Sequence, residues 1–136
     1  MSNFFVFDTN SLISAALIAS STNRKALNKA INLEELAIAN NTIHELIEVL
    51  FRKKFDKYFP DDNERWLLIN KLEINATLFT PAIQITDCMD PKDNKFLELA
   101  IAAKVSCLIT GDKDLLILHP FRNIPILNAV DFINNF

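Results

Sequence analysis

The sequence predicts an α/β fold of three layers, α/β/α, in which helices cover both faces of a doubly wound parallel sheet of four or five strands. Short apolar runs that suit buried strands alternate along the chain with segments of helical periodicity. Strands separated by helices pair in parallel through crossover connections. Half of the 136 residues are apolar, and a chain of this length buries about 68% of its unfolded surface in one core. We therefore expect one domain over residues 1–136.

The N-terminal third holds two predicted strands and two predicted helices. Phe4–Phe7 is wholly apolar, as a strand buried on both faces requires. Ser11–Ala19 follows with helical periodicity, and Asn23–Asn32 places its alanines and a leucine on one face of a second helix. Leu36–Ala39 is the next apolar run and therefore the second predicted strand.

The central part of the chain is predicted to be mainly helical. Asn41 and Thr42 open a helix that runs to about Phe55, because its apolar residues recur at three- and four-residue intervals. Asp61 or Asp62 has the short acceptor side chain that caps a helix, and an apolar stretch follows. A second helix is therefore expected after these aspartates.

The C-terminal part alternates between strands and helices again. The segment Thr77–Cys88 is either irregular or holds a short strand around Ile83–Ile85. Asp90 followed by Pro91 predicts the start of a helix to about Lys104, since an acid suits the cap and proline suits the first turn. Two further apolar strands are predicted at Ser106–Ile109 and Ile124–Leu127. Two short helical segments are predicted at Leu115–Leu118 and in the turn from Val130.

Composition excludes several functional classes. The formal net charge is −3, so the chain as a whole does not attract nucleic acid or an anionic membrane. A single glycine excludes the Gly-rich phosphate loops of nucleotide-binding folds. Cys88 and Cys107 have no metal-ligand spacing, which favours a reducing cytoplasm over a disulfide framework. Asp8 and Asn10 interrupt the apolar stretch Phe4–Ala19, so we expect neither a signal peptide nor a membrane span.

Aspartates follow two of the predicted strands. Asp8 comes directly after the first strand, and Asp112 and Asp114 follow the Ser106–Ile109 strand. In an open parallel sheet the carboxyl ends of the strands form the functional edge, so these acids are expected at one rim. The ordinary alternative is that each aspartate only caps the element that follows it.

Glu45 and Asp93 are predicted to differ in their surroundings. Glu45 fits a capping box with Thr42, and helical periodicity places it on a solvated face. Asp93 falls instead within the apolar arc of its helix, so it faces inward and needs a ligand, a donor or a cation. Its alternative role is a favourable charge in the first helical turn, while Asp90 is the expected cap.

These acids together predict metal-assisted phosphodiester hydrolysis. Asp8, Glu45, Asp93 and Asp112 would gather at one rim with no evident lysine or histidine between them, so the carboxylates would repel one another. Mg²⁺ or Mn²⁺ prefers such an all-oxygen ligand set and relieves that repulsion. Phosphate is the natural substrate group for such an ion.

Four acidic motifs occur in a characteristic order along nearly the whole chain. They are Val6-Phe7-Asp8-Thr9-Asn10, Thr42-Ile43-His44-Glu45-Leu46, Asp90-Pro91-Lys92-Asp93-Asn94-Lys95-Phe96 and Ile109-Thr110-Gly111-Asp112-Lys113-Asp114. This ordered set resembles the PIN domains, and most of all the VapC-related toxin components of bacterial toxin-antitoxin systems.

The resemblance implies a Mg²⁺- or Mn²⁺-dependent ribonuclease. Its catalytic and metal-binding acids would be Asp8, Glu45, Asp93 and Asp112. Asn10 and Thr110 match positions that support such a site by hydrogen bonds. Asp114 matches a frequent additional acid, which either contacts metal or caps the next turn.

The expected partners are an RNA substrate, a cognate antitoxin and a second copy of the chain, with no membrane. Arg52, Lys53 and Lys54 belong to a dense basic run that could hold RNA phosphates, although an Arg52 pair with Glu48 is the ordinary alternative. For an antitoxin segment we expect an apolar groove between two helices. Its predicted walls are two helices, one that carries Ala26 and Leu27 and one that carries Trp66 and Ile69. For the second helix, packing of these side chains in the core is the ordinary alternative.

Two other functions remain open from the sequence. A noncatalytic PIN-type interaction module would bind metal weakly or not at all, and a nuclease of this type could also act on structured DNA. A phosphatase of the haloacid dehalogenase type is disfavoured, because it expects an acid two residues after Asp8 and Asn10 occupies that position.

Overall fold

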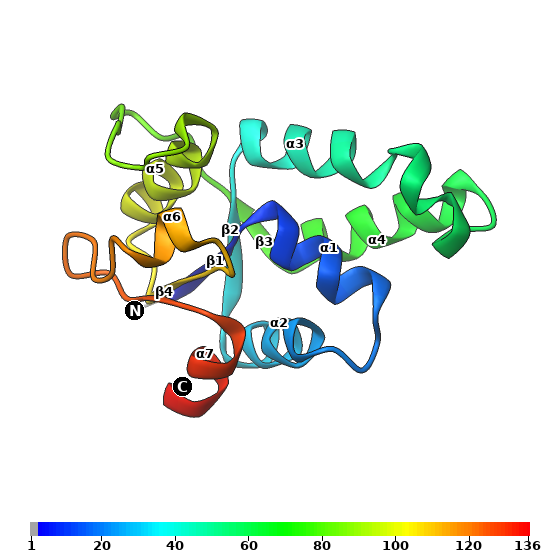
Figure 1. Cartoon of the computed structure of the whole chain (residues 1–136), viewed down its shortest axis with the longest axis horizontal. Coiled ribbons are helices and arrows are strands. Elements are labelled where there is room, and N and C mark those ends of the chain that lie inside the picture. The colour runs from blue at the N-terminus through cyan, green and yellow to red at the C-terminus, as the bar shows by residue number, and fades with distance from the viewer. Residues whose placement is uncertain (1–2) are drawn as a thin grey trace.

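The computed structural model describes residues 3–136 as a parallel sheet covered by helices on both faces (Figure 1). The five strands lie in the order β3-β2-β1-β4-β5, and every neighbouring pair is parallel. Their bounds are β1 Phe4–Phe7, β2 Glu35–Ile38, β3 Ala76–Leu78, β4 Cys107–Ile109 and β5 Ile126–Leu127. The chain adds β2 and β3 on one side of β1 and then β4 and β5 on the other. The predicted doubly wound α/β sheet is therefore confirmed.

The helices divide between the two faces of the sheet. Phe5 and Phe7 of β1 lie in a core formed with α1 to α4 and α7, whereas Val6 lies in a second core beneath α5 and α6. Among residues 3–136, none of the helices has the length and apolar character needed to cross a membrane. Their bounds are α1 Thr9–Leu17, α2 Thr22–Leu33, α3 Asn40–Leu50, α4 Asp62–Ile74, α5 Asn94–Ala103, α6 Lys113–Leu116 and α7 Ala129–Asn135, with 3₁₀ turns η1 Lys53–Tyr58 and η2 Pro91–Asp93.

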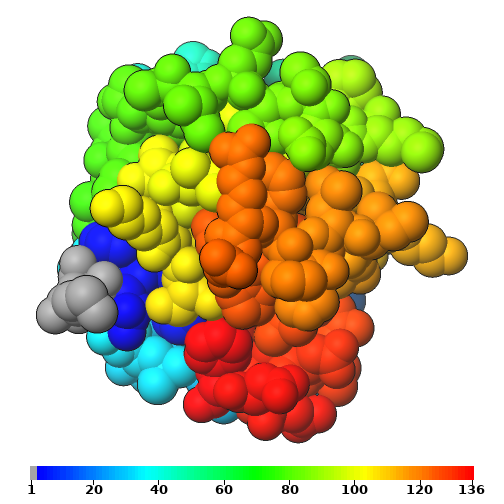
Figure 2. Space-filling view, turned by 90° about the vertical axis from the view of Figure 1, so that its left-hand side faces the viewer, coloured from blue at the N-terminus to red at the C-terminus, as the bar shows by residue number. Residues whose placement is uncertain are grey.

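The third strand lies earlier in the chain than the strand that was one of the two alternatives for the segment Thr77–Cys88. A strand at Ile83–Ile85 is wrong, because β3 begins at Ala76 directly after α4 and pairs with β2 from Leu36 onward. The segment after β3 is irregular, as the other alternative predicted, and it lies beside α5 (green beside yellow in Figure 2). There the backbone N–H of Ile85 donates to the Glu98 carboxylate at 2.9 Å, so a side chain replaces a strand partner.

The predicted groove walls are mostly core residues. Ala26, Leu27 and Ile69 are buried in the core on the α1 to α4 side of the sheet. Trp66 is 45% exposed and lies against the Phe51 ring, with the ring centroids 5.0 Å apart. Ala26 and Ile69 therefore pack in the core, which is the ordinary alternative. Leu27 of α2 also lines a small hollow together with Leu68 and Leu72 of α4, so the two predicted helices border a common hollow, and its use by a partner stays a prediction.

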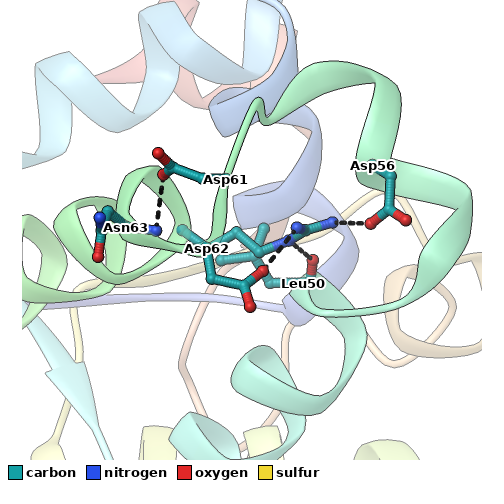
Figure 3. A network of polar contacts seen from close by, with 6 residues as sticks. Leu50, Asp56, Asp61, Asp62 and Asn63 are labelled. Atoms are coloured by element: carbon teal, nitrogen blue, oxygen red, sulfur yellow. Dashed lines mark hydrogen bonds and ion pairs between the residues drawn. The ribbon is translucent and has the colours of Figure 1, made fainter.

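A buried arginine lies at the end of α3, which comes earlier than the apolar periodicity predicts. The helix ends at Leu50, not near Phe55, and η1 follows. The Arg65 side chain is almost fully buried, and its Nε donates to the Leu50 carbonyl at 2.8 Å (Figure 3). Its other nitrogens donate to Asp62 and Asp56 at 3.1 and 2.8 Å. At the end of α3 the Leu50 carbonyl therefore accepts from a side chain, where a longer helix would supply a backbone N–H.

Removing the Arg65 guanidinium should destabilise the fold without affecting metal binding. We expect Arg65→Met to lower the free energy of unfolding by about 1–3 kcal/mol, because it leaves the buried Leu50 carbonyl without a partner while keeping an apolar stem. Denaturant unfolding of the purified variant measures this change. Asp56→Asn is the matched control, since Asp56 is largely exposed and should contribute less than about 1 kcal/mol. Equal stability of Arg65→Met and the unmodified protein would contradict this account.

Candidate active site

The predicted acids approach one another at the carboxyl edge of the sheet. Glu45, Asp93 and Asp112 line a cleft of about 350 Å³. Asp8 lines an adjoining hollow of about 260 Å³, and Asp112 also lines that hollow. The two spaces share Asn10 as a further lining residue. Four segments distant in sequence thus supply one continuous acidic region.

Asp8 is both a helix cap and a member of this region. One carboxylate oxygen accepts from the backbone N–H of Ser11 at 2.9 Å, which caps α1. The other oxygen accepts from the hydroxyl of Thr110, which follows β4. Burial raises the pKa of Asp8 and the nearby Asp112 adds to this effect, while the bonds from Ser11 and Thr110 oppose it. The capping role and a position in the site are therefore compatible.

Asp112 caps the next helix and is linked to Asp8 through Thr110. Its side chain accepts from the backbone N–H of Asp114 at 2.9 Å, and its own N–H donates to the Thr110 hydroxyl oxygen at 2.9 Å. The Thr110 hydroxyl thus joins two acids. Asp114 lies in the first turn of α6, outside the set of described residues that line the two hollows. Asn10 is exposed where the hollows meet.

Asp93 lies among other carboxylates and partly out of water. It is half-buried at the start of α5 and makes no capping hydrogen bond there, unlike Asp90, which accepts from the Lys92 N–H at 3.1 Å. The pKa of Asp93 is raised from 3.8 to about 7, first by burial, then by the hydrogen bond and charge of Asp112, and then by the charges of Asp90 and Asp8. Asp90 also lines the cleft, a position that the capping rule alone did not predict.

Glu45 does not lie on a solvated helix face, and it does not form the expected capping box. The helix begins at Asn40 with Ala39 as its cap, and Thr42 at the third position bonds back to the Ala39 N–H at 3.0 Å. Glu45 is half-buried and pairs with Lys95 of α5, with 2.5 Å between Oε2 and Nζ. The expectation that no lysine lies among the acids is therefore wrong.

Basic residues border the cleft on one side. Arg52 lines it and pairs with Glu48 at 3.6 Å, in an exposed contact like the predicted one. Lys53 and Lys54 lie in the exposed η1 turn. Lys92 also lines the cleft, although the sequence reasoning did not select it.

The donor chemistry of the site fits a hard divalent cation. The carboxylates at this edge of the sheet raise one another's pKa because their negative charges repel. A bound Mg²⁺ or Mn²⁺ would supply the positive charge that relieves this repulsion. Among residues 3–136, no three acidic, histidine or cysteine side chains are already gathered around one metal position. Glu45 instead faces the ammonium group of Lys95, so a complete ligand set requires side-chain movement.

The sequence profile of the PIN domain matches residues 5–114, which contain all four acids and the strands that position them. The chain belongs to the PIN-domain family. PIN domains are generally nucleases, and the acidic edge of this PIN domain suits that chemistry. An uncharacterized protein of Methanocaldococcus jannaschii, MJ1680, is 30% identical over 117 residues, which are 84% of this chain and 74% of the relative.

Two solved structures share the fold of this PIN domain. PAE2754 from Pyrobaculum aerophilum superposes with a TM-score of 0.63 at 17% identity, over 98% of this chain and 88% of the other. VapBC2 from Rickettsia felis, solved bound to a DNA fragment from its promoter, superposes with a TM-score of 0.61 at 12% identity. The match covers 92% of this chain and 98% of the other. At these identities the likeness establishes the common architecture.

The raised pKa of Asp93 predicts that the metal-free PIN domain loses stability as pH rises. The folded protein binds this proton up to about pH 7, whereas the unfolded chain releases it near 3.8, so the free energy of unfolding falls across that window. We expect a decrease of about 1–2 kcal/mol, discounted because the carboxyl group is partly exposed. Melting curves in EDTA from pH 4 to 8 measure it. Asp93→Asn should flatten this dependence, and an unchanged dependence in the variant would contradict the assignment.

Proposed function

We propose that this PIN domain is a Mg²⁺- or Mn²⁺-dependent endoribonuclease and the toxin of a type II toxin-antitoxin module, acting in the cytoplasm. One observation carries the proposal: acids from four separate motifs line two adjoining hollows at the carboxyl edge of the sheet, and Asp8, Asp93 and Asp112 among them repel one another, which a cation would relieve. The VapBC2 structure is a toxin-antitoxin neighbour of the same fold, which supports the toxin assignment.

The proposed metal ligands are Asp8, Glu45, Asp93 and Asp112. A bound divalent cation supplies Lewis acidity that lowers the pKa of water and neutralises phosphate charge. Thr110 and Ser11 hold both oxygens of Asp8 in one orientation, and Asn10 borders the position where substrate would enter. We leave Asp114 outside the ligand set, because the cleft-lining residues do not include it.

The basic residues beside the cleft are suited to an RNA backbone. Arg52 borders the acids directly, and its exposed pair with Glu48 contributes little to stability and can be exchanged for a phosphate. Lys53 and Lys54 extend this charge along η1. In this arrangement the acids would hold a cation that neutralises charge on the scissile phosphate, and the basic turn would hold a neighbouring phosphate.

Incubation of the purified protein with total cellular RNA tests the proposal. We expect cleavage with MnCl₂ that EDTA abolishes and that Asp8→Asn lacks. Parallel reactions contain structured DNA. Cleavage of DNA alone would replace RNA by DNA as the substrate. Weak or absent Mn²⁺ binding, together with no cleavage of either nucleic acid, would favour a noncatalytic module.

The proposed partners are an antitoxin and a second copy of this chain. Exposed Trp66 and Leu67 on α4 offer apolar surface of the kind that protein partners cover. Light scattering of the purified chain and copurification with the product of the adjacent gene test these two assignments. A monomer that recovers no such partner would overturn both.

A further inference from the structure

Lys95 forms an ion pair with Glu45, one of the four acids, in the metal-free protein. Its Nζ lies 2.5 Å from Oε2 of Glu45, and the side chains are only 17% and 25% exposed. The neighbouring pair of Arg52 and Glu48 is 3.6 Å apart and 51% and 76% exposed. Water and salt screen a sheltered pair less than an exposed one. The Lys95 contact is therefore the stronger restraint on its glutamate.

The Glu45–Lys95 pair lies where the acidic cleft meets a second groove. Glu45 borders both the 350 Å³ cleft and an open groove of about 670 Å³ that Lys95, Asn41 and His44 also line. Lys95 is a lining residue of the groove and Asp93 of the cleft, so Glu45 lies between a cation and the other acids.

We propose that Lys95 is a positioning residue that holds Glu45 away from the metal site until a divalent cation displaces it. This inference rests on the proposed metal-dependent function. The cation must exchange the Glu45–Lys95 ion pair for its own contact with the Glu45 carboxylate, so the pair competes with metal. Lys95 thereby weakens metal binding and stabilises the empty site against the repulsion of its acids.

Titration of the full-length protein with MnCl₂, followed by thermal melting and calorimetry, tests this proposal. Lys95→Met should lower the apparent dissociation constant for Mn²⁺ at least about fivefold, because loss of a contact near 1 kcal/mol changes an equilibrium by about this factor. Lys92→Met is the matched control. It removes one positive charge that borders the acids, as Lys95→Met does, but Lys92 has no ion pair with Glu45 among residues 3–136, so its effect should stay below about twofold.

A second pair of variants separates positioning from a general charge effect. In a Glu45→Gln background, Lys95→Met should change Mn²⁺ affinity no more than Lys92→Met does, since the competing ion pair is already lost. Lys95→Arg keeps both the charge and the pair and should bind Mn²⁺ as the unmodified protein does. If Lys95→Met does not fold, Lys95→Gln provides the same comparison with a smaller loss of packing.

The outcomes distinguish this inference from the proposed function. Equal gains in Lys95→Met and Lys92→Met, or weaker Mn²⁺ binding in Lys95→Met, would overturn the positioning role while leaving the metal site intact. Absence of any Mn²⁺ response in the unmodified protein would overturn the metal-dependent function as well.

Discussion

Asp93→Asn should reduce Mn²⁺-dependent RNA cleavage by at least about 100-fold, because even the loss of an outer-shell partner of a metal ligand costs 10–100-fold. Asp90→Asn should change the rate less than about threefold, since asparagine caps a helical turn as well as aspartate does. Both acids border the cleft, but Asp90 uses its side chain to cap η2 while Asp93 makes no such bond. Initial cleavage rates of the two variants at saturating MnCl₂ measure the difference.

The same two variants should differ in metal-free stability. Asp93→Asn removes one of the mutually repelling charges, so its melting temperature in EDTA should stay equal or rise at neutral pH. Asp90→Asn should melt as the unmodified protein does. An active Asp93→Asn beside an inactive Asp90→Asn would mean that the metal uses the other acid, and two active variants would remove the start of α5 from the site.

Millimolar Mn²⁺ should raise the melting temperature of the unmodified protein by about 10 °C. A cation at 100 times its dissociation constant that binds only the folded state adds about 2.7 kcal/mol, and about 4 °C per kcal/mol is expected for a domain of this size. Asp8→Asn should lose this increase, because an amide in place of the carboxylate removes a charged ligand. Scanning calorimetry with MnCl₂ or EDTA measures both.

Asp8→Asn is a usable variant because its helix-capping role survives the change, although an amide nitrogen cannot accept from the Thr110 hydroxyl. Asparagine retains an oxygen that can accept the Ser11 N–H at the start of α1. We therefore expect a folded variant whose melting temperature in EDTA is close to that of the unmodified protein. Identical curves with EDTA and with Mn²⁺ for the unmodified protein would contradict the metal site itself.

Most of the sheet could be predicted because buried parallel strands carry a strong local signal. Phe4–Phe7 is wholly apolar and is the central strand β1. The third strand was harder to predict, because Ala76–Leu78 is short and only one of its residues is strongly apolar. Its place follows from pairing with β2, which is a long-range contact that periodicity does not report.

The acids of the site were also predictable, because the carboxyl ends of parallel strands lie together whatever the loops do. Asp8 directly follows β1, and Asp112 follows β4 after Thr110 and Gly111. The contacts of these acids were less accessible to sequence reasoning. Lys95 meets Glu45 only because α3 and α5 lie side by side, and Arg65 reaches the end of α3 from α4. Both are tertiary contacts between long, flexible side chains.

The two hydrogen bonds on Asp8 have a consequence for the thermodynamics of any ligand at this edge. Each carboxylate oxygen already accepts one donor, from Ser11 and from Thr110, so folding itself has removed the rotational freedom of this side chain. A ligand that meets Asp8 therefore loses no further conformational entropy there. Glu45 must change partners and Asp93 is held by no cap, so their ordering opposes binding. Asp8 is the preorganised member of the acidic region, and the entropic cost of assembling the site falls on Glu45 of α3 and on Asp93 at the end of η2.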